Sequence, residues 1–137
     1  MFNSFLRHDL KVEEGNITLL RSEQATRKGI LDALETLIGN ENIQNGDTIL
    51  IFFAGHGSRA PAPEGWKSSD GRIEFICPHD IGALQGDATD VGGGKRVEAI
   101  PDRTLSALFR RLARQHGDNI VRSSRVLPFQ LINIPHR

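Results

Sequence analysis

A histidine flanked by two glycines has the residue type and the position that could carry out chemistry. His56 lies in Gly55-His56-Gly57, directly after the apolar and β-branched run "TILIFFA". Histidine titrates near neutral pH, so it can accept or donate a proton under physiological conditions. Glycines on both sides would let the backbone bend sharply and approach a substrate without an intervening Cβ atom. The motif predicts either a catalytic histidine or a histidine that caps an ordinary strand-to-loop turn.

Cys77 and His79 in "ICPHD" form a second candidate site. Two residues apart on a strand, they would share a face, and together with His56 they could form a Cys/His zinc site. A lone cysteine beside a proline is more commonly a small buried apolar residue. A Cys77 thiolate activated by a histidine is a further alternative, although Pro78 stiffens the backbone there.

Acidic residues are scattered through and after the glycine-rich segment 58–95, at Asp70, Asp80, Asp87, Asp90 and Asp102. Carboxylate oxygens are the ligands that calcium prefers. Their spacing is not that of an EF-hand loop, and solvation of a loop is the simpler interpretation.

The elements before His56 form a strand, a helix and a second strand. "ITLL" (Ile17–Leu20) follows a Gly-Asn turn, and "TRKGILDALETLIGN" has one apolar face, with Thr26 as its N-cap and Gly39 as its stop. The continuous apolar run from Thr48 to Ala54 is typical of a strand covered on both faces in a parallel sheet. This order predicts an α/β fold, in which ligands bind at the carboxyl ends of the strands. His56 would lie at such an end.

The remaining segments are also assigned by their apolar spacing. The chain begins within a helix, and segment 58–95 is a long loop with an embedded strand or hairpin at 72–77. A second amphipathic helix starts near Asp102 and ends at Gly117, with leucines on one face and the solvated Arg110, Arg111 and Arg114 on the other. The last stretch, "VRSSRVLPFQLINIPHR", is apolar in part but has no clean period.

Composition excludes several classes of function. The 137 residues contain 17 basic and 17 acidic side chains, so no net charge attracts nucleic acid or a membrane surface. The single cysteine cannot form an internal disulfide, and neither a signal peptide nor a membrane span is predicted. We expect one domain-sized unit in a reducing, cytoplasmic environment, with no nucleic-acid or membrane partner.

Four segments in order resemble a known family. "ATRKGILDALETLI", "GDTILIFFAGHGSRA", "FICPHD" and "IPDRTLSALFRRLA" are similar to the caspase-like cysteine peptidases, most closely their metacaspase branch. The resemblance implies a caspase-like three-layer α/β/α sandwich and a Cys/His dyad that cleaves protein or peptide substrates. It implies that His56 is the dyad histidine and that the backbone N–H of Gly57 is an oxyanion-hole donor. Asp80 and Asp102 would be the nearest equivalents of the family's calcium ligands.

The sequence also departs from the family pattern. The family's nucleophilic cysteine follows the second helix, whereas no cysteine follows Cys77 here, and Cys77 matches a non-catalytic cysteine of the pattern. The family's first strand, which belongs between the strands at Ile17 and Thr48, has no counterpart before Ile17. We therefore expect an incomplete sandwich that lacks the first strand and the nucleophile-bearing strand, and that leaves two strand edges unpaired. Residues 1–120 would form a partial peptidase domain and residues 121–137 a divergent C-terminal tail.

These departures lead to three functional hypotheses. The first is a fragment of a cysteine endopeptidase, altered after Ile120 by splicing or gene structure, that keeps the histidine loop and is inactive alone. The second is a non-catalytic module that binds a partner peptidase or a peptide through the cleft around His56. The third is a hydrolase that uses Cys77. Calcium is the one cofactor that the resemblance suggests.

Overall fold

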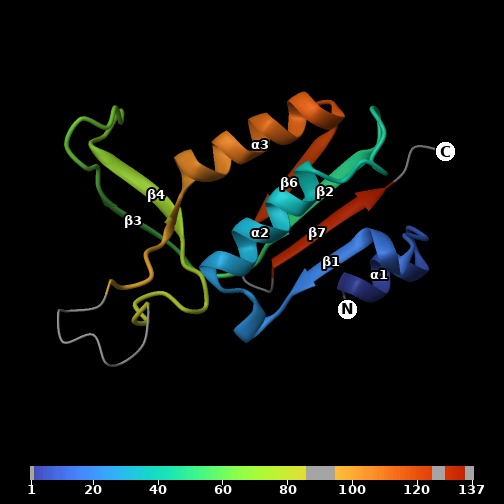
Figure 1. The fold of residues 1–137 in the computed structure, drawn as a ribbon, viewed down its shortest axis with the longest axis horizontal. Helices are drawn as coiled ribbons and strands as arrows, with labels where there is room; N and C mark the ends of the chain where they lie inside the picture. The colour runs from blue at the N-terminus through green and yellow to red at the C-terminus, as the bar shows by residue number, and fades with distance from the viewer. Residues whose placement is uncertain (1, 86–94, 125–128, 135–137) are drawn as a thin grey trace.

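The computed structural model of the chain describes residues 2–85, 95–124 and 129–134. The helices are α1 (Phe2–His8), α2 (Arg27–Ile38) and α3 (Asp102–His116), with short 3-10 turns at Glu14–Asn16 and Ser22–Gln24. The strands are β1 (Ile17–Leu20), β2 (Thr48–Phe53), β3 (Gly57–Pro61), β4 (Arg72–Ile76), β5 (Ile100–Pro101), β6 (Ile120–Ser124) and β7 (Phe129–Ile134). They form a four-stranded sheet in the order β1-β7-β2-β6 and a smaller sheet in the order β3-β4-β5 (Figure 1). The mixture of helices and sheets confirms an α/β fold.

Helix α2 forms as its sequence predicts. The hydroxyl of Thr26 accepts a hydrogen bond from the N–H of Gly29 at 3.0 Å, and Gly39 is the C-cap residue. Ile30 and Leu34 are fully buried on the face toward the main sheet. Both predicted helix ends are therefore confirmed.

Helix α3 also has the predicted bounds and orientation. It begins at Asp102 after Pro101 and ends before Gly117, whose φ of 90° few other residues adopt without strain. Leu108 and Leu112 are buried against α2 and the sheet, whereas Arg110, Arg111 and Arg114 are exposed.

The central strand β2 is buried on both faces, as predicted, but its sheet is mixed. β2 pairs in parallel with β6, starting at Ile49↔Ile120, and antiparallel with β7, starting at Thr48↔Ile134. β7 also pairs antiparallel with β1, with Ile17 opposite Ile132. The sheet is therefore not the uniformly parallel one that the βαβ order predicted.

The expected gap between β1 and β2 does not exist, because β7 fills it. The prediction of two unpaired strand edges there was wrong for a physical reason. The last stretch contains a central strand, β7, which pairs with both β1 and β2 and whose Leu131 is only 1% exposed. A strand, β6, does follow α3, although it carries no cysteine.

The glycine-rich segment contains the predicted hairpin. β3 and β4 pair antiparallel from Gly57↔Ile76 to Pro61↔Arg72, and β4 pairs with the short β5. In Figure 1 this hairpin projects beyond one end of the main sheet, near the start of α3.

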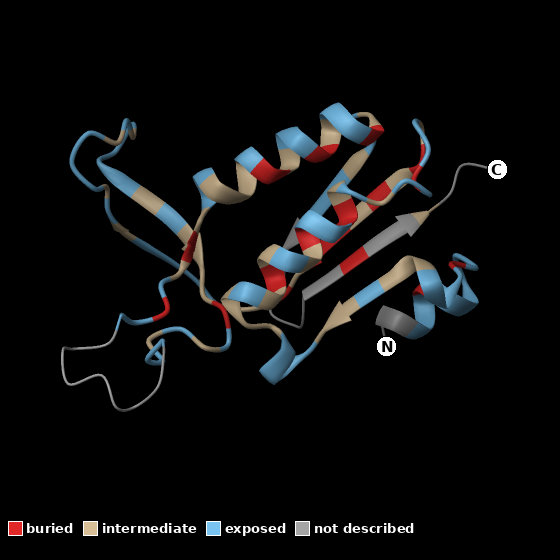
Figure 2. Cartoon of the chain, viewed as in Figure 1, coloured by how far each residue is buried: buried red, intermediate tan, exposed pale blue. Residues whose placement is uncertain are grey.

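The apolar core has two parts on opposite faces of the main sheet (Figure 2). The larger lies between the sheet and the α2–α3 pair and includes Ile49, Ile51 and Leu131. The smaller places Leu6 of α1 and Val12 against residues of the other face, Leu50 among them. No helix in the described part of the chain is long and apolar enough to span a membrane.

Candidate functional site

His56 lies where the chain passes from the main sheet to the hairpin. β2 ends at Phe53, and β3 begins at Gly57, so His56 follows the carboxyl end of a central strand, as predicted. Its side chain is exposed. Gly55 leaves room for the Phe53 ring, since a Cβ atom there would come within 2.6 Å of it and the ring would have to shift. The strand therefore places His56 in solvent at the edge of a buried core.

A pocket of about 360 Å³ adjoins His56. Cys77 and His79 also line it, so the structure brings together the three residues singled out from the sequence. Its other walls are mainly apolar and come from the segment before α2, from α2 itself, from the end of β2 and from the segment after β4: Ser22, Ala25, Ile30, Phe53, Ala54, Gly55, Pro78 and Ile81.

His56 and Cys77 lie opposite each other across the two strands of the hairpin. The N–H of Cys77 donates to the carbonyl oxygen of His56 at 2.8 Å, which continues the register Gly57↔Ile76 by one step. Residues that face each other in an antiparallel pair project to the same side of the sheet. The two side chains therefore share a face. In the described structure the hydrogen bond between these residues is the backbone one, and their side chains form none with each other.

The zinc interpretation is not supported by this arrangement. Within residues 2–85, 95–124 and 129–134, no group of three or more His, Cys, Asp or Glu side chains is placed to hold a metal ion. Cys77 is half-buried beside the buried Pro78, which agrees with its interpretation as a small packing residue.

Asp80 has a structural role that the sequence did not reveal. Its Oδ1 accepts a hydrogen bond of 2.7 Å from the N–H of Arg27, the first residue of α2. Nearby, the N–H of His79 donates to the carbonyl oxygen of Ala25 at 2.9 Å. A carboxylate at a helix N-terminus satisfies a free N–H group and complements the helix dipole. Asp80 thus joins the segment after β4 to the start of α2.

Asp102 lies elsewhere. It is the exposed first residue of α3, and its Oδ1 accepts from the N–H of Arg103 at 2.7 Å. Asp80 lines a pocket of about 510 Å³ beside α2, whereas Asp102 lines a different one beside the hairpin. A shared calcium site for the pair therefore stays a prediction. Asp87 and Asp90 lie outside the described residues.

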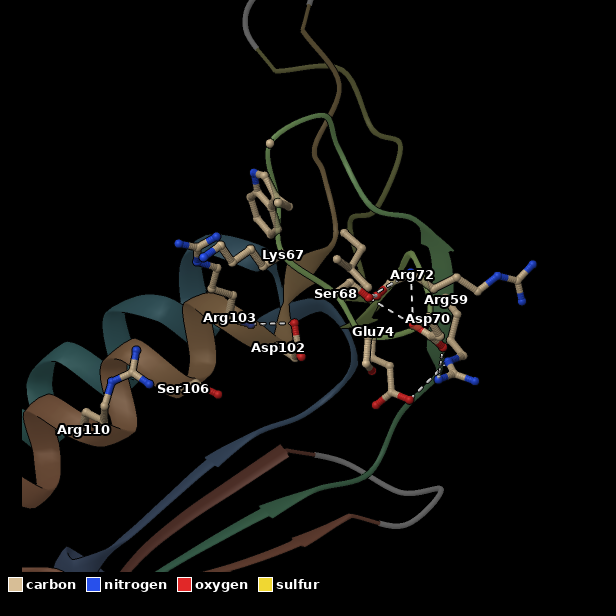
Figure 3. Close-up of a pocket in the computed structure, with 14 residues that line it drawn as sticks. Arg59, Lys67, Ser68, Asp70, Arg72, Glu74, Asp102, Arg103, Ser106 and Arg110 are labelled. Carbon is tan, nitrogen blue, oxygen red and sulfur yellow. Dashed lines mark hydrogen bonds and ion pairs between the residues drawn. The ribbon is translucent and has the colours of Figure 1, made fainter.

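The pocket lined by Asp102 is the larger one, about 670 Å³, between the tip of the β3–β4 hairpin and the first turns of α3 (Figure 3). Arg59 pairs with Asp70 at 3.2 Å and with Glu74 at 3.2 Å on its hairpin wall. Hydrogen bonds from the Arg72 N–H and the Ser68 hydroxyl, with the charge of Arg59, lower the pKa of Asp70. Both carboxylates of this wall are therefore paired with the same guanidinium group.

The ends of β2 and β6 lie side by side. Their register runs in parallel to Phe53↔Ser124, three residues before His56. A side chain just after β6 would therefore be close to the histidine loop. The only cysteine of the sequence, however, is Cys77 in the hairpin.

Comparison with known proteins identifies relatives of this chain. The model of the family described as "Metacaspase, peptidase C14 domain" matches residues 3–112. Metacaspase-4 of Arabidopsis thaliana is 37% identical over 79 residues, which are 54% of this chain and 18% of that protein. Metacaspase-6 of the same plant is 34% identical over 79 residues, 54% of this chain and 21% of that protein. The chain spans about a fifth of the length of these curated relatives. No solved structure matches it.

Proposed function

Since the chain belongs to the metacaspase family of C14 peptidases, we propose that it is a cysteine-peptidase relative that keeps the histidine loop and does not cleave peptides alone. One observation carries the proposal. β2 and β6 end side by side with His56 just beyond β2, while no cysteine follows Cys77. On this proposal, His56 would be the histidine of a dyad, at a strand end whose neighbour supplies no thiol.

In a Cys/His dyad the thiolate attacks the scissile carbonyl carbon, and the histidine protonates the leaving amine. A backbone N–H stabilises the oxyanion that develops on the carbonyl oxygen. His56 and Gly57 would fill the second and third roles. Because Cys77 bonds to His56, the alternating pattern of an antiparallel pair directs the N–H of the next residue, Gly57, away from β4. That N–H is oriented toward the exposed side of the loop, but without a thiol no acyl-enzyme can form.

A peptidase assay tests this proposal. Purified chain would be incubated with fluorogenic peptides that have a basic or an acidic P1 residue, with and without calcium, beside an active metacaspase as positive control. We expect no turnover above buffer. Turnover that His56→Ala abolishes and His79→Ala preserves would overturn the proposal, since both histidines line the same pocket.

Hydrolysis by Cys77 is a second candidate because one geometric observation favours it. Cys77 and His56 face each other across the hairpin and line one pocket. A peptide acyloxymethyl ketone would alkylate an activated thiol there, and mass spectrometry would locate the adduct. Labelling and turnover that are both lost in Cys77→Ser would favour this candidate. Turnover unchanged in Cys77→Ser would exclude it.

A third candidate, from the non-enzymatic class, is a module that binds a peptide or a partner peptidase in the pocket beside His56. The mainly apolar walls of that pocket support it. Ala25→Trp would fill the pocket from the turn before α2, so it should abolish peptide binding measured by calorimetry. Ala107→Trp, at an exposed position of α3 that does not line this pocket, is the matched control.

The sequence after Ile120, which contains no cysteine, is itself part of the proposal. Transcripts that splice after the codon for Ile120 into a strand containing cysteine would support a fragment of a longer peptidase. A uniform transcript that encodes residues 121–137 as they stand would favour the binding module.

A further inference from the structure

The face of α3 that lies away from the His56 pocket is strongly basic. Five exposed cations lie along it and on the two segments beside it, and we call them the α3 basic face: Lys67, Arg103, Arg110, Arg114 and Arg122. Four carboxylates line the same two hollows: Asp70 and Glu74, which pair with Arg59 on the hairpin wall, and Asp102 and Asp118 beside α3. The whole chain has equal numbers of acidic and basic residues, so its charges are unevenly distributed in space.

Two hollows run together along this face. The first is the pocket of about 670 Å³ at the hairpin, and the second is one of about 400 Å³ between α3 and β6. Ser106 and Arg110 line both, so the two form one continuous groove along α3. Figure 3 shows Lys67, Arg103 and Arg110 on the α3 side of the first hollow, while the side chain of Arg72 points away from it.

The cations of the α3 basic face are not neutralised by the protein. Within the described residues, none of the five forms an ion pair, whereas Arg111 on the same helix pairs with Glu35. Two of them rest on aromatic rings: Arg103 lies 5.1 Å from the centre of the Trp66 ring, and Arg122 lies 5.3 Å from that of Phe109. Such stacking fixes guanidinium groups in place while their N–H donors stay available.

The groove also borders a free strand edge. β6 is the last strand on its side of the main sheet among the described strands, and Val121 is 49% exposed. The N–H of Ile49 in β2 donates to the carbonyl oxygen of Asn119. Residues two apart in a strand direct their backbone groups to the same side, so the backbone groups of Asn119 and Val121 point toward β2. Those of Ile120 and Arg122 then point outward, because the direction alternates along a strand. An added strand could bond to them.

We propose that an extended peptide segment rich in Asp and Glu binds here, as a strand added to the outer edge of β6. Its backbone would bond to Ile120 and Arg122, as in other cases of strand addition. Side chains on one face of the added strand would enter the hollow between α3 and β6, where the carboxylates meet Arg110, Arg114 and Arg122. The peptide is expected to be acidic because the groove is basic, and extended because only an extended segment can pair with a strand edge. This surface is separate from the pocket at His56, so the inference does not depend on peptidase chemistry.

Fluorescence anisotropy with the complete chain tests the charge requirement. The probe is a labelled peptide of about twelve residues that alternates Glu or Asp with Val or Thr, and its control replaces each carboxylate by the amide. We expect saturable binding of the acidic peptide that weakens as salt increases, and no binding of the amide peptide. Equal binding of both peptides would overturn the proposal. So would tighter binding of a single-stranded RNA oligonucleotide at the same salt, which would indicate a different class of partner.

Charge-reversal variants test the location. Arg110→Glu and Arg114→Glu should each weaken binding about tenfold, whereas Lys95→Glu, an exposed change outside the groove, should alter it less than about twofold. All three replace exposed cations, and circular dichroism would verify that they fold alike. Equal effects of the three changes would contradict the proposed location.

N-methylated peptides test the strand edge. Two acidic peptides would carry N-methyl groups on alternate amides, in opposite frames. One edge of an added strand faces β6 and the other faces solvent, so one peptide should lose binding and the other keep it. Equal binding by both would exclude strand addition. Light scattering would show whether the chain forms a dimer. If the peptide binds only after that dimer dissociates, the partner at this edge is a second copy of the chain, and the proposal of an acidic partner is overturned.

Discussion

Arg111 and Glu35 form a two-pronged ion pair that joins α3 to α2. Nη1 of Arg111 lies 2.6 Å from Oε1 of Glu35, and Nη2 lies 2.8 Å from Oε2. The hydrogen bond from Arg111 lowers the pKa of Glu35 below its ordinary value. A carboxyl group with a lowered pKa stabilises the fold above its unfolded-state pKa, and that contribution is lost as the pH falls through the folded-state pKa.

We therefore expect Glu35→Gln to lower the melting temperature slightly at neutral pH and to have less effect as the pH falls below the ordinary carboxyl range. The effect should be small and reduced by salt, because the two side chains are 49% and 51% exposed. Glu41→Gln, an exposed position that forms no ion pair in the described structure, is the control. A difference from wild type that stays constant down to acid pH would contradict this account.

Gly29→Ala should destabilise α2, whereas Gly39→Ala should not. A Cβ atom at Gly29 would lie 2.4 Å from the carbonyl oxygen of Gln24, a backbone atom that cannot move aside easily. The nearest atom to a Cβ at Gly39 is 3.6 Å away, an ordinary contact. We expect a loss of about 1–3 kcal/mol in the free energy of unfolding for the first change, measured in urea. The second should change it by less than about 0.5 kcal/mol.

The two roles suggested for Asp80 give different mutational results. As the acceptor for the Arg27 N–H, it should cost about 1 kcal/mol when replaced by Ala, and Asp80→Asn should recover most of that loss because an oxygen acceptor remains. As a calcium ligand, it would behave differently: both variants would lose any stabilisation that calcium gives to the wild type. Thermal melts with calcium and with a chelator separate the two roles, and Asp9→Ala at an exposed position is the control.

Leu131→Ala tests the position of β7. Leu131 is 1% exposed and belongs to the core between the sheet and the two long helices. Truncating it should reduce the free energy of unfolding by about 2–5 kcal/mol. Leu84→Ala removes the same atoms from a side chain that is 59% exposed, so it should have little effect. Equal losses for the two variants would show that β7 does not contribute to the core.

Local patterns predicted the local structure. The bounds of α2 and α3 follow from apolar spacing plus caps that lie within a few residues, such as Thr26 and Gly117. The place of His56 follows from the strand before it. These features depend on residues close in sequence, so one chain is enough to find them.

The features that the sequence did not predict depend on distant pairings. No local sequence pattern predicts that the strand containing Leu131 inserts between β1 and β2. Likewise, the residue that donates a hydrogen bond to Asp80 is 53 positions away in the sequence. The arginines of α3 were correctly predicted to be exposed. Their significance depends on Lys67 and Arg122, which only the fold brings to the same face.

The position of β7 has a consequence for how the chain folds during synthesis. β1 and β2 are made early, but each pairs with a strand that begins only at Phe129. Until that strand leaves the ribosome, the β1 edge of β2 has no partner, and closing the sheet requires a loop of more than a hundred residues between β1 and β7. The unfinished sheet would expose apolar strand edges until β7 is synthesised. Chaperones that bind extended apolar segments on the ribosome would therefore meet this protein before its sheet is complete.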